Sequence, residues 1–342
     1  MQTAPESLRI ASTSAYYTER SQSAIALDAL ALPRTVRTVD FGNSRRAATT
    51  AMLDALLGTG DQIVVASEKR LTQAGSAAQL AYGDGAAAVR IGEGGGARLA
   101  GFASVTHDLV DRYASQDHPT PYVYEERFVR DVAVAELIVP AIRDACEEAG
   151  IEPGHLTHVA VAEPVGGTWA AAARQLKVAA PNHCQSVSDA AGDLGTAMPL
   201  YGLGLALAAA AVGDYVLVVG FGSGVDALVF EVTGEVEGVA GFAEVLAQGF
   251  RLTSPTRFLN LSGALSLDWG CARNSSRNRR PPCWSASAAT PSASSAGATV
   301  GATSSSPRAP IRSTRLCPSP KCWRTCALPI WRRRSSRSRR TG

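Results

Sequence analysis

The chain has 342 residues, 46% of them apolar, so it is long enough to bury one large core or two ordinary ones and is not disordered throughout. Its formal charge of +3 hides a split, because residues 1–270 hold 18 Lys and Arg against 30 Asp and Glu, whereas residues 271–342 hold 15 against none. The folded part is therefore acidic, and the overall charge does not indicate nucleic-acid binding.

The sequence also predicts no association with a membrane. The N-terminal stretch MQTAPESLRI lacks the basic start and apolar core of a signal peptide. The longest apolar run, residues 200–213, is shorter than the roughly 20 residues that span a bilayer, and it predicts a buried helix. Residues 1–270 contain only Cys146 and Cys184, so we expect a cytoplasmic protein.

Residues 1–100 predict a first half of alternating strands and helices. After the strand SLRIASTS and the helix SQSAIALDALALP, residues 42–66 give a glycine turn, an alanine-rich helix, a Gly-Asp stop and an apolar strand. In the next segment, YGDGAAAVRIG, we expect Asp84 to satisfy turn N–H groups between its two glycines. This half begins almost directly at a strand, so we expect the opening portion of a larger design to be absent.

Residues 101–131 predict an inserted, loop-rich region that suits a lid or an interface. His118 lies there among residues that can transfer protons or enclose a pocket, namely Tyr122, Tyr124, Glu125 and Glu126. The alternative is a solvated loop with surface ion pairs.

Residues 132–240 predict a second half that repeats the first. A helix in LIVPAIRDACEEAG leads into the strand LTHVAVAEP and the helix TWAAAARQLKV, and residues 192–219 then repeat the order found in residues 42–66. Apolar strands alternating with helices predict sheets that helices cover on both faces. The duplication predicts two such halves packed together.

The segments YGDGAAAV and GFGSGVDAL, which close the two halves, resemble the thiolase superfamily, and in particular the 3-hydroxy-3-methylglutaryl-CoA (HMG-CoA) synthase-like proteins and the third-type ketoacyl-ACP synthases. The resemblance covers roughly residues 7–235, and EERFVRD at 125–131 looks like the bacterial HMG-CoA synthase-like branch. It implies an α/β fold of duplicated αβαβα layers with two mixed sheets. It also implies acyl-CoA as ligand without a cofactor or metal, and a homodimer or a complex with a thiolase and an OB-fold protein.

The resemblance implies a reaction centre that this sequence lacks. The family uses a cysteine at the start of the helix after the first glycine turn, assisted by a histidine and an asparagine from the later half. Arg45 stands at the cysteine position, Ala162 or Glu163 at the histidine position, and Asp193 at the asparagine position. A guanidinium cannot be acylated, so the acyl-enzyme route is closed.

The remaining site predictions concern what this altered centre does. Arg45, Asp193 and His118 are the candidate catalytic residues, and the candidate substrate-binding residues are Gly222, Ser223 and Gly224. The N–H groups of residues 45 and 223 would point at a thioester oxygen.

Two of these residues have alternative interpretations. Arg45 and the adjacent Arg46 either hold a carboxylate or phosphate or only fill a helix start. Asp193 acts as a base if burial raises its pKa, or it caps the helix that follows. The neighbours His183 and Cys184 are expected on an extended strand, with side chains on opposite faces.

After residue 240 the sequence changes character. Residues 241–270 are interpreted as a linker toward a lost OB-fold-like domain. Residues 271–342 contain five cysteines and no acidic residue, and they lack any helical or strand period. This composition is typical of GC-rich DNA read in a shifted frame, and it predicts a disordered tail. A genuine basic tail for nucleic acid or acidic lipid is the alternative.

The resemblance therefore implies an acyl-CoA-handling, condensing-enzyme-like protein. It would be an acyltransferase by likeness, and without the cysteine it would perform aldol-type carbon–carbon chemistry on a CoA thioester. A non-catalytic scaffold subunit of a thiolase and OB-fold complex is the alternative, and a decayed gene product is a third hypothesis.

Overall fold

The computed structural model describes residues 4–109, 111–115, 117–123, 125–248, 252–261 and 327–331. The predictions for Tyr124, for residues 262–270 and for nearly all of the basic tail lie outside the described residues.

The first half of the chain forms one mixed sheet. Its strands lie in the order β2 (Arg37–Phe41), β1 (Ser7–Ala11), β3 (Gln62–Glu68) and β4 (Gly85–Gly92). The first three strands are parallel and β4 is antiparallel to β3. Strand β1 is completely buried; Leu8, Ile10 and Ala11 are apolar, and the buried Arg9 forms an ion pair with Asp54.

The second half forms a matching mixed sheet. Here β8 (Leu156–Val161) is parallel to β9 (Tyr215–Phe221), and β9 is followed by the antiparallel strands β10 (Gly224–Val232) and β5 (Ala97–Thr106). A further strand, β11 (Ala327–Trp331), pairs with β4 and touches the edge of β5, so that the two sheets join into one of nine strands. The predicted pair of mixed sheets is thus present, with a bridging strand between them.

Helices fill the layers around these sheets. In chain order the helical segments are α1 (Gln22–Ala29), α2 (Ala47–Leu57), α3 (Ala77–Ala81), α4 (Glu126–Val132), η1 (Ala133–Ile138), α5 (Val139–Ala149), η2 (Pro153–His155), α6 (Thr168–Leu176), α7 (His183–Ala191), η3 (Gly195–Ala197), α8 (Met198–Ala209), α9 (Ala240–Ala247) and α10 (Pro255–Leu261). A short ribbon pairs β6 (Arg112–Tyr113) with β7 (Tyr122–Val123). No helix among these is long and apolar enough to cross a membrane.

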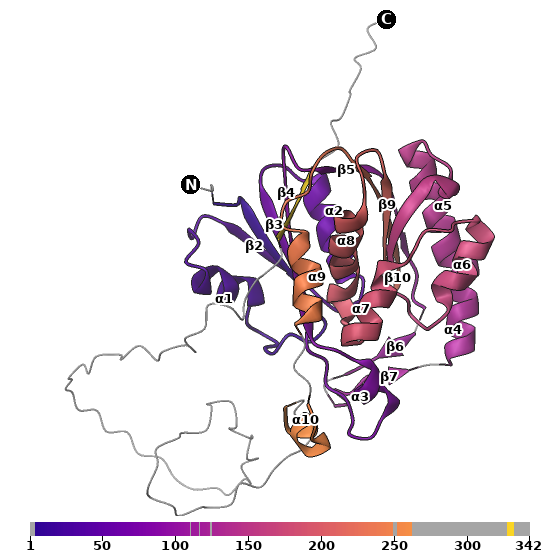
Figure 1. Cartoon of the computed structure of the whole chain (residues 1–342). Coiled ribbons are helices and arrows are strands. Elements are labelled where there is room, and N and C mark those ends of the chain that lie inside the picture. Colours follow the sequence, from indigo (N-terminus) through magenta and orange to yellow (C-terminus); the bar gives the residue numbers. More distant parts are fainter. Residues whose placement is uncertain are drawn as a thin grey trace, which may run out of the picture. The chain divides into compact units, whose positions relative to one another are not determined.

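The layers follow the predicted αβαβα order, as Figure 1 shows. Helix α1 packs on β1 and β2, helices α2 and α8 lie between the two sheets, and α5 covers β5 and β10 on the far side. Strand β9 serves two cores: Val216 and Val218 face the central helices, whereas Leu217 and Val219 face the outer helices. The run predicted as a buried helix is α8, whose residues are nearly all buried.

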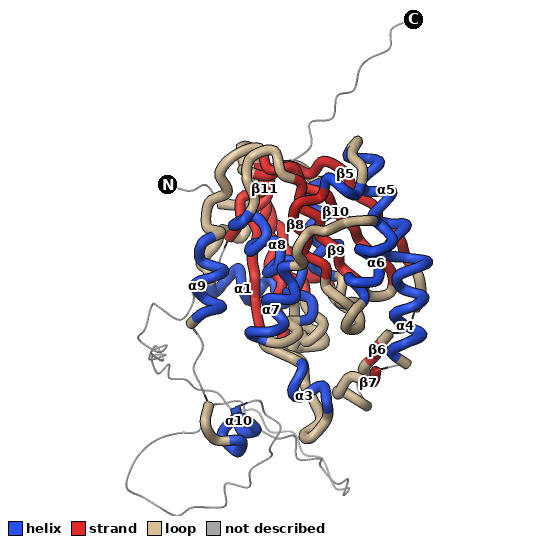
Figure 2. Tube along the Cα trace, turned by 45° about the vertical axis from the view of Figure 1, so that its right-hand side comes forward, coloured by secondary structure: helices blue, strands red, loops and turns tan. Residues whose placement is uncertain are grey.

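The internal duplication is confirmed in three dimensions. The order α2, β3, β4 recurs as α8, β9, β10. The tube view in Figure 2 shows α8, β9 and β10 close together. Two expected boundaries fall elsewhere. Strand β5 runs through residue 100 and pairs with β10 of the second half. Helix α9, expected in a linker, places the fully buried Phe242 against Gly204 of α8.

Candidate functional site

The start of α2 meets the glycine turn that joins β9 to β10. The Ser44 hydroxyl donates a hydrogen bond to the Gly222 carbonyl (2.6 Å). A Cβ added to Gly222 would lie 2.9 Å from the Arg45 backbone nitrogen, so only glycine allows this approach. In the same turn Ser223 has a φ of 47°, a left-handed conformation. The two segments predicted to converge on one point are therefore adjacent.

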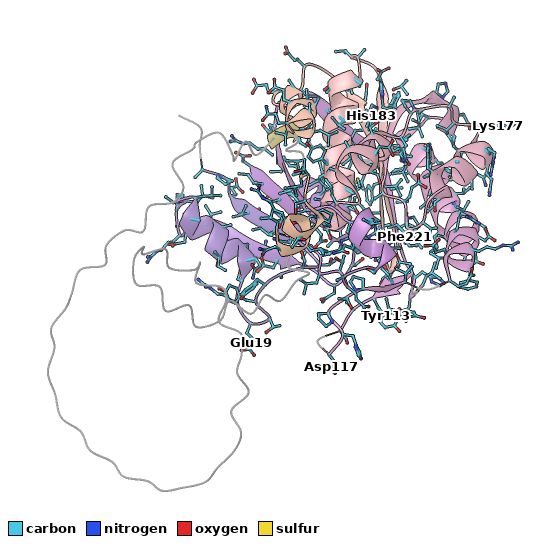
Figure 3. All side chains as sticks on the ribbon, turned by 60° about the horizontal axis from the view of Figure 1, so that its bottom comes forward. Glu19, Tyr113, Asp117, Lys177, His183 and Phe221 are labelled. Atoms are coloured by element: carbon cyan, nitrogen blue, oxygen red, sulfur yellow. The ribbon has the colours of Figure 1, made fainter. Side chains whose placement is uncertain are left out.

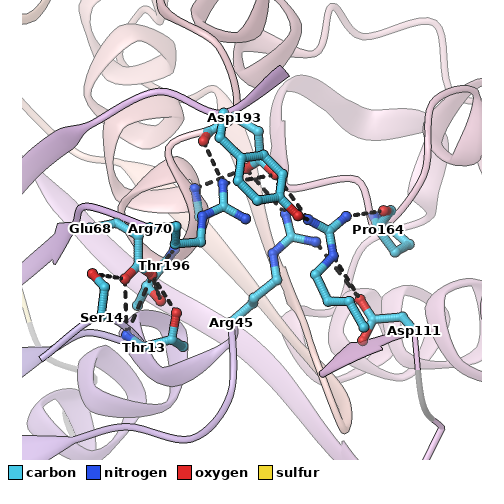
Figure 4. Close-up of polar contacts among 12 residues, drawn as sticks. Thr13, Ser14, Arg45, Glu68, Arg70, Asp111, Pro164, Asp193 and Thr196 are labelled. Carbon is cyan, nitrogen blue, oxygen red and sulfur yellow. Dashed lines mark hydrogen bonds and ion pairs between the residues drawn. The ribbon is translucent and has the colours of Figure 1, made fainter. Parts of the chain in front are cut away.

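The side chain of Arg45 turns into the protein and meets Asp193. One guanidinium nitrogen donates to both carboxylate oxygens of Asp193, at 2.9 and 3.2 Å. Figure 4 shows this contact between the start of α2 and the loop that follows α7. The positions that the resemblance assigns to the cysteine and the asparagine are thus brought together, and they form an ion pair.

Two more arginines complete what we call the arginine cluster, defined by Arg45, Arg70, Arg112, Asp111, Asp193 and Tyr82 (Figure 4). Arg70 and Arg112 approach the same oxygen, Asp193 Oδ2, at 3.2 and 3.5 Å. Arg112 also donates to the Tyr82 hydroxyl (2.6 Å), and the guanidinium of Arg70 stacks 3.5 Å from the centre of the Tyr82 ring. Asp111 lies 3.8 Å from both Arg45 and Arg112.

The electrostatics of the cluster favour the charged form of Asp193. Burial by itself opposes that charge, but the cations of Arg45, Arg70 and Arg112 outweigh it and hold the pKa of Asp193 far below its ordinary value of 3.8. Burial and the charge of Arg45 lower the pKa of Arg112 to about 10. Asp193 is consequently a poor base at neutral pH, and the condition for its role as a base, a raised pKa, is not met.

The second arginine of the pair at the helix start has a separate partner. Arg46 donates to Asp226 in β10 (3.2 Å), and the buried carboxylate of Asp226 also accepts from the hydroxyls of Thr49, Thr50 and Ser104. The side chain of Arg46, the N-cap residue, makes no capping hydrogen bond to α2. Arg46 therefore connects the start of α2 to β10 in the second half, in addition to filling the helix start as the sequence alternative predicted.

A buried carboxylate lies next to the arginine cluster. Glu68, at the end of β3, accepts from the hydroxyls of Thr13 (2.9 Å) and Thr196 (2.6 Å) and from the backbone N–H of each residue. Figure 4 shows Glu68 with Thr13, Ser14 and Thr196, beside Arg70. The network connects the ends of β1 and β3 to the segment after Asp193 and so fixes the loop that carries Asp193.

Comparisons of this structure with known proteins give several solved structures of similar architecture. MvaS in complex with 3-hydroxy-3-methylglutaryl coenzyme A matches with a TM-score of 0.59 and 17% identity over 76% of this chain and 75% of that chain. The 3-oxoacyl-[acyl-carrier-protein] synthase III from Aquifex aeolicus VF5 matches with a TM-score of 0.56 and 16% identity, over 66% and 77%. The HMG synthase of the curacin biosynthetic pathway matches with a TM-score of 0.57 and 16% identity, over 76% and 72%.

The fold is that of the HMG-CoA synthases and third-type ketoacyl-ACP synthases. No protein-family model and no curated protein matches the sequence. At these identities the likeness defines the architecture of this chain as a condensing-enzyme fold, and the chemistry has to be judged from its own residues.

At the position that the resemblance assigns to the histidine, neither Ala162 nor Glu163 forms a hydrogen bond or ion pair with Arg45 among the described residues. The side chain of Ala162 is buried in the core between the sheets. The adjacent Glu163 accepts a hydrogen bond from the Trp169 N–H (3.2 Å) at the start of α6. Burial raises the pKa of Glu163. Both residues therefore support local structure.

The third candidate catalytic residue, His118, lies in the region after β6. It is exposed, and its backbone closes a turn with Ser115 through hydrogen bonds of 2.9 and 3.1 Å. Figure 3 shows the neighbouring Tyr113 and Asp117 at the edge of the molecule. No contact between His118 and the arginine cluster occurs among the described residues, and its catalytic role stays a prediction.

Two further expectations are changed by the structure. Asp84 is exposed and lies 3.8 Å from Lys69 Nζ, so a surface ion pair is its contact. His183 and Cys184 begin the helix α7, where an extended strand was expected. The His183 ring lies 3.1 Å from His158, whereas the Cys184 thiol is buried and its pKa is raised by burial. The two side chains still diverge.

Sequence reasoning missed four members of the cluster, Arg70, Arg112, Asp111 and Tyr82. Arg70 comes two residues after β3, a strand parallel to β1. Polar residues just beyond the carboxyl ends of parallel strands are a usable signal, because such ends share one edge of a sheet. Asp111 and Arg112 carry no comparable signal, since they come from the inserted region.

Proposed function

We propose that this chain binds a CoA thioester without forming an acyl-enzyme. The observation that carries the proposal is the ion pair of Arg45 with Asp193 at the start of α2. A protonated guanidinium has no lone pair with which to attack a thioester. The close approach of the Gly222 turn to the Arg45 backbone supports a preserved place for the thioester oxygen.

Non-covalent binding is better supported than aldol-type bond chemistry. An aldol step needs a base within reach of the substrate. The pKa of Asp193 is held far down by three arginines, and Glu163 already accepts hydrogen bonds at the start of α6. The carbon–carbon chemistry expected from the resemblance therefore remains a narrower proposal that depends on a base supplied by the substrate or a partner.

A scaffold subunit is the second candidate function. It is favoured by large apolar side chains left exposed around α3, β6, β7 and α4, namely Leu71, Leu80, Tyr113, Tyr122 and Phe128. Apolar side chains gathered on one region of a surface mark contact sites for other proteins. The partner proposed for this role is a second copy of the chain, or a thiolase with an OB-fold protein.

The test uses acetyl-CoA and a branched hydroxyacyl-CoA as probes. We expect saturable heat of binding by calorimetry, no mass increase of the intact protein and no release of free CoA. The variant Gly222→Ala should lose binding, because its methyl group would press on Ser44 and the Arg45 backbone, whereas Gly154→Ala has open space and should bind normally. A covalent acyl adduct, or no binding of either probe, would reject the proposal.

A further inference from the structure

The arginine cluster holds more positive charge than its own carboxylates balance. Arg45, Arg70 and Arg112 all approach Asp193 Oδ2, at 2.9, 3.2 and 3.5 Å. Asp111 supplies the second negative charge, at 3.8 Å from two of them. Within the part of the chain that the structure describes, three cations are thus paired with two anions. The cluster is one negative charge short.

The same guanidinium groups also have unused hydrogen-bond donors. Arg45 Nε, Arg70 Nε, Arg70 Nη1 and Arg112 Nε are buried and find no acceptor among the described residues. The side chains of Arg45 and Arg70 are only 9% and 5% exposed, so bulk water does not readily accept hydrogen bonds from these N–H groups. Buried polar groups are nearly always satisfied in folded proteins, and those left over indicate a missing partner.

The surroundings limit what that partner is. The buried carboxylate of Glu68, beside the cluster, already accepts from Thr13, Ser14 and Thr196. Of the charged members, Asp193 and Arg112 are the more exposed, at 20% and 14%, so they lie on the side of the cluster nearer to solvent. A planar guanidinium presents parallel N–H groups, which match the oxygens of a carboxylate or a phosphate.

We propose that the arginine cluster binds one small oxyanion, a carboxylate or phosphate group, through the free donors of Arg45, Arg70 and Arg112. The bound group supplies the missing negative charge and accepts the unpaired N–H groups. The inference concerns the site of the proposed function but does not rest on it, since oxyanion binding requires no CoA.

The experiment titrates the full chain with sodium acetate and, separately, with inorganic phosphate, with ionic strength held constant by chloride. We expect a saturable rise in the thermal unfolding midpoint and a matching heat of binding for at least one anion. The variant Arg112→Gln should bind that anion about tenfold more weakly, as the loss of a charge-assisted hydrogen bond predicts. The stronger of the two arms identifies the preferred oxyanion.

The control is Arg127→Gln, which removes an equal charge from an exposed position on α4. It should bind like the wild type. If Arg112→Gln does not fold, Arg112→Lys keeps the charge and removes the planar fork, and it should also weaken binding. The proposal is overturned if the wild type shows no saturable response to either anion, or if the Arg112 variants bind as well as Arg127→Gln. Normal acyl-CoA binding alongside that result would leave the proposed function intact.

Discussion

Arg45 places a permanent positive charge at the start of α2. Its guanidinium lies at the start of a buried helix, where burial opposes a charge, and the carboxylates of Asp193 and Asp111 more than compensate, so that the pKa of Arg45 is raised. The position therefore stays cationic at every physiological pH. A guanidinium here pairs with a carboxylate and cannot act as a nucleophile.

Asp193→Asn tests the electrostatic role of the cluster. It leaves three buried guanidinium groups facing one carboxylate, and breaking a buried ion network in this way costs about 3–5 kcal/mol. We expect the free energy of unfolding, measured by urea denaturation at pH 7, to fall by that amount. Asp84→Asn, at an exposed ion pair, should change it by less than about 0.5 kcal/mol.

The pH dependence of the Asp193 contribution has a definite sign. Because the folded-state pKa lies below 3.8, the stabilisation is complete above that pH and declines as the pH falls below it. If Asp193→Asn and Asp84→Asn lowered the free energy of unfolding equally at pH 7, the arginine cluster would not stabilise the fold through Asp193.

The His158 and His183 pair predicts a separate pH effect. Burial and the neighbouring His158 lower the pKa of His183 below 6.5. The unfolded chain then binds more protons than the folded chain, so stability falls as the pH drops below about 6.5. The variant His183→Gln should show a shallower loss between pH 7 and pH 5 in thermal unfolding, whereas His118→Gln, at an exposed site, should keep the wild-type slope. Identical slopes in all three proteins would disprove the assignment.

At the scale of elements, the two halves are linked by loops that approach very closely. Gly83, before β4, donates its N–H to the Asp193 carbonyl, and Asp193 donates to the Ala81 carbonyl. These bonds fix the loop after α3 against the loop after α7. They hold Asp193 close to Tyr82 and so help to position the arginine cluster.

Gly83→Ala tests that contact. A methyl group there would overlap the carbonyl oxygen of Ala191, and backbone cannot move aside as a side chain can. Overpacking of this kind should lower the free energy of unfolding by about 3 kcal/mol. The comparison is Gly154→Ala, where no atom lies within 4 Å. A Gly83→Ala variant as stable as Gly154→Ala would show that the two loops are not tightly packed.

At the scale of the whole described unit, β4 and its counterpart in the second half, β10, have different neighbouring strands. In the second half, β10 pairs on the side away from β9 with the antiparallel strand β5. In the first half, the corresponding side of β4 is paired with β11 in parallel, with Ala327 opposite Ala88. Residues from the far end of the sequence thus complete the sheet of the first half.

Removal of residues 324–342 tests this pairing. Without β11, the backbone N–H and C=O groups on one side of β4 lose their partners and become a free sheet edge. We expect faster amide hydrogen exchange in β4, measured by mass spectrometry, by about tenfold or more, as loss of hydrogen bonding predicts. Exchange in β8, at the other end of the sheet, should not change. Unchanged exchange in β4 would argue against the pairing.

The sequence by itself determined the fold class, because burial patterns repeat locally. The apolar strands, the glycine turns and the duplicated order of residues 42–66 and 192–219 all follow from spacing within short segments. The absence of an acylatable side chain at residue 45 was likewise readable from the residues alone.

Only the tertiary structure decided what surrounds Arg45. Its partner Asp193 is 148 positions away, Arg70 lies in the loop after β3, and Arg112 lies in strand β6. No local period relates these positions, and each arginine considered alone is typical of a solvated surface. Their charges interact only after the two sheets pack on shared helices and bring these segments together, where low solvent access makes every unpaired group costly.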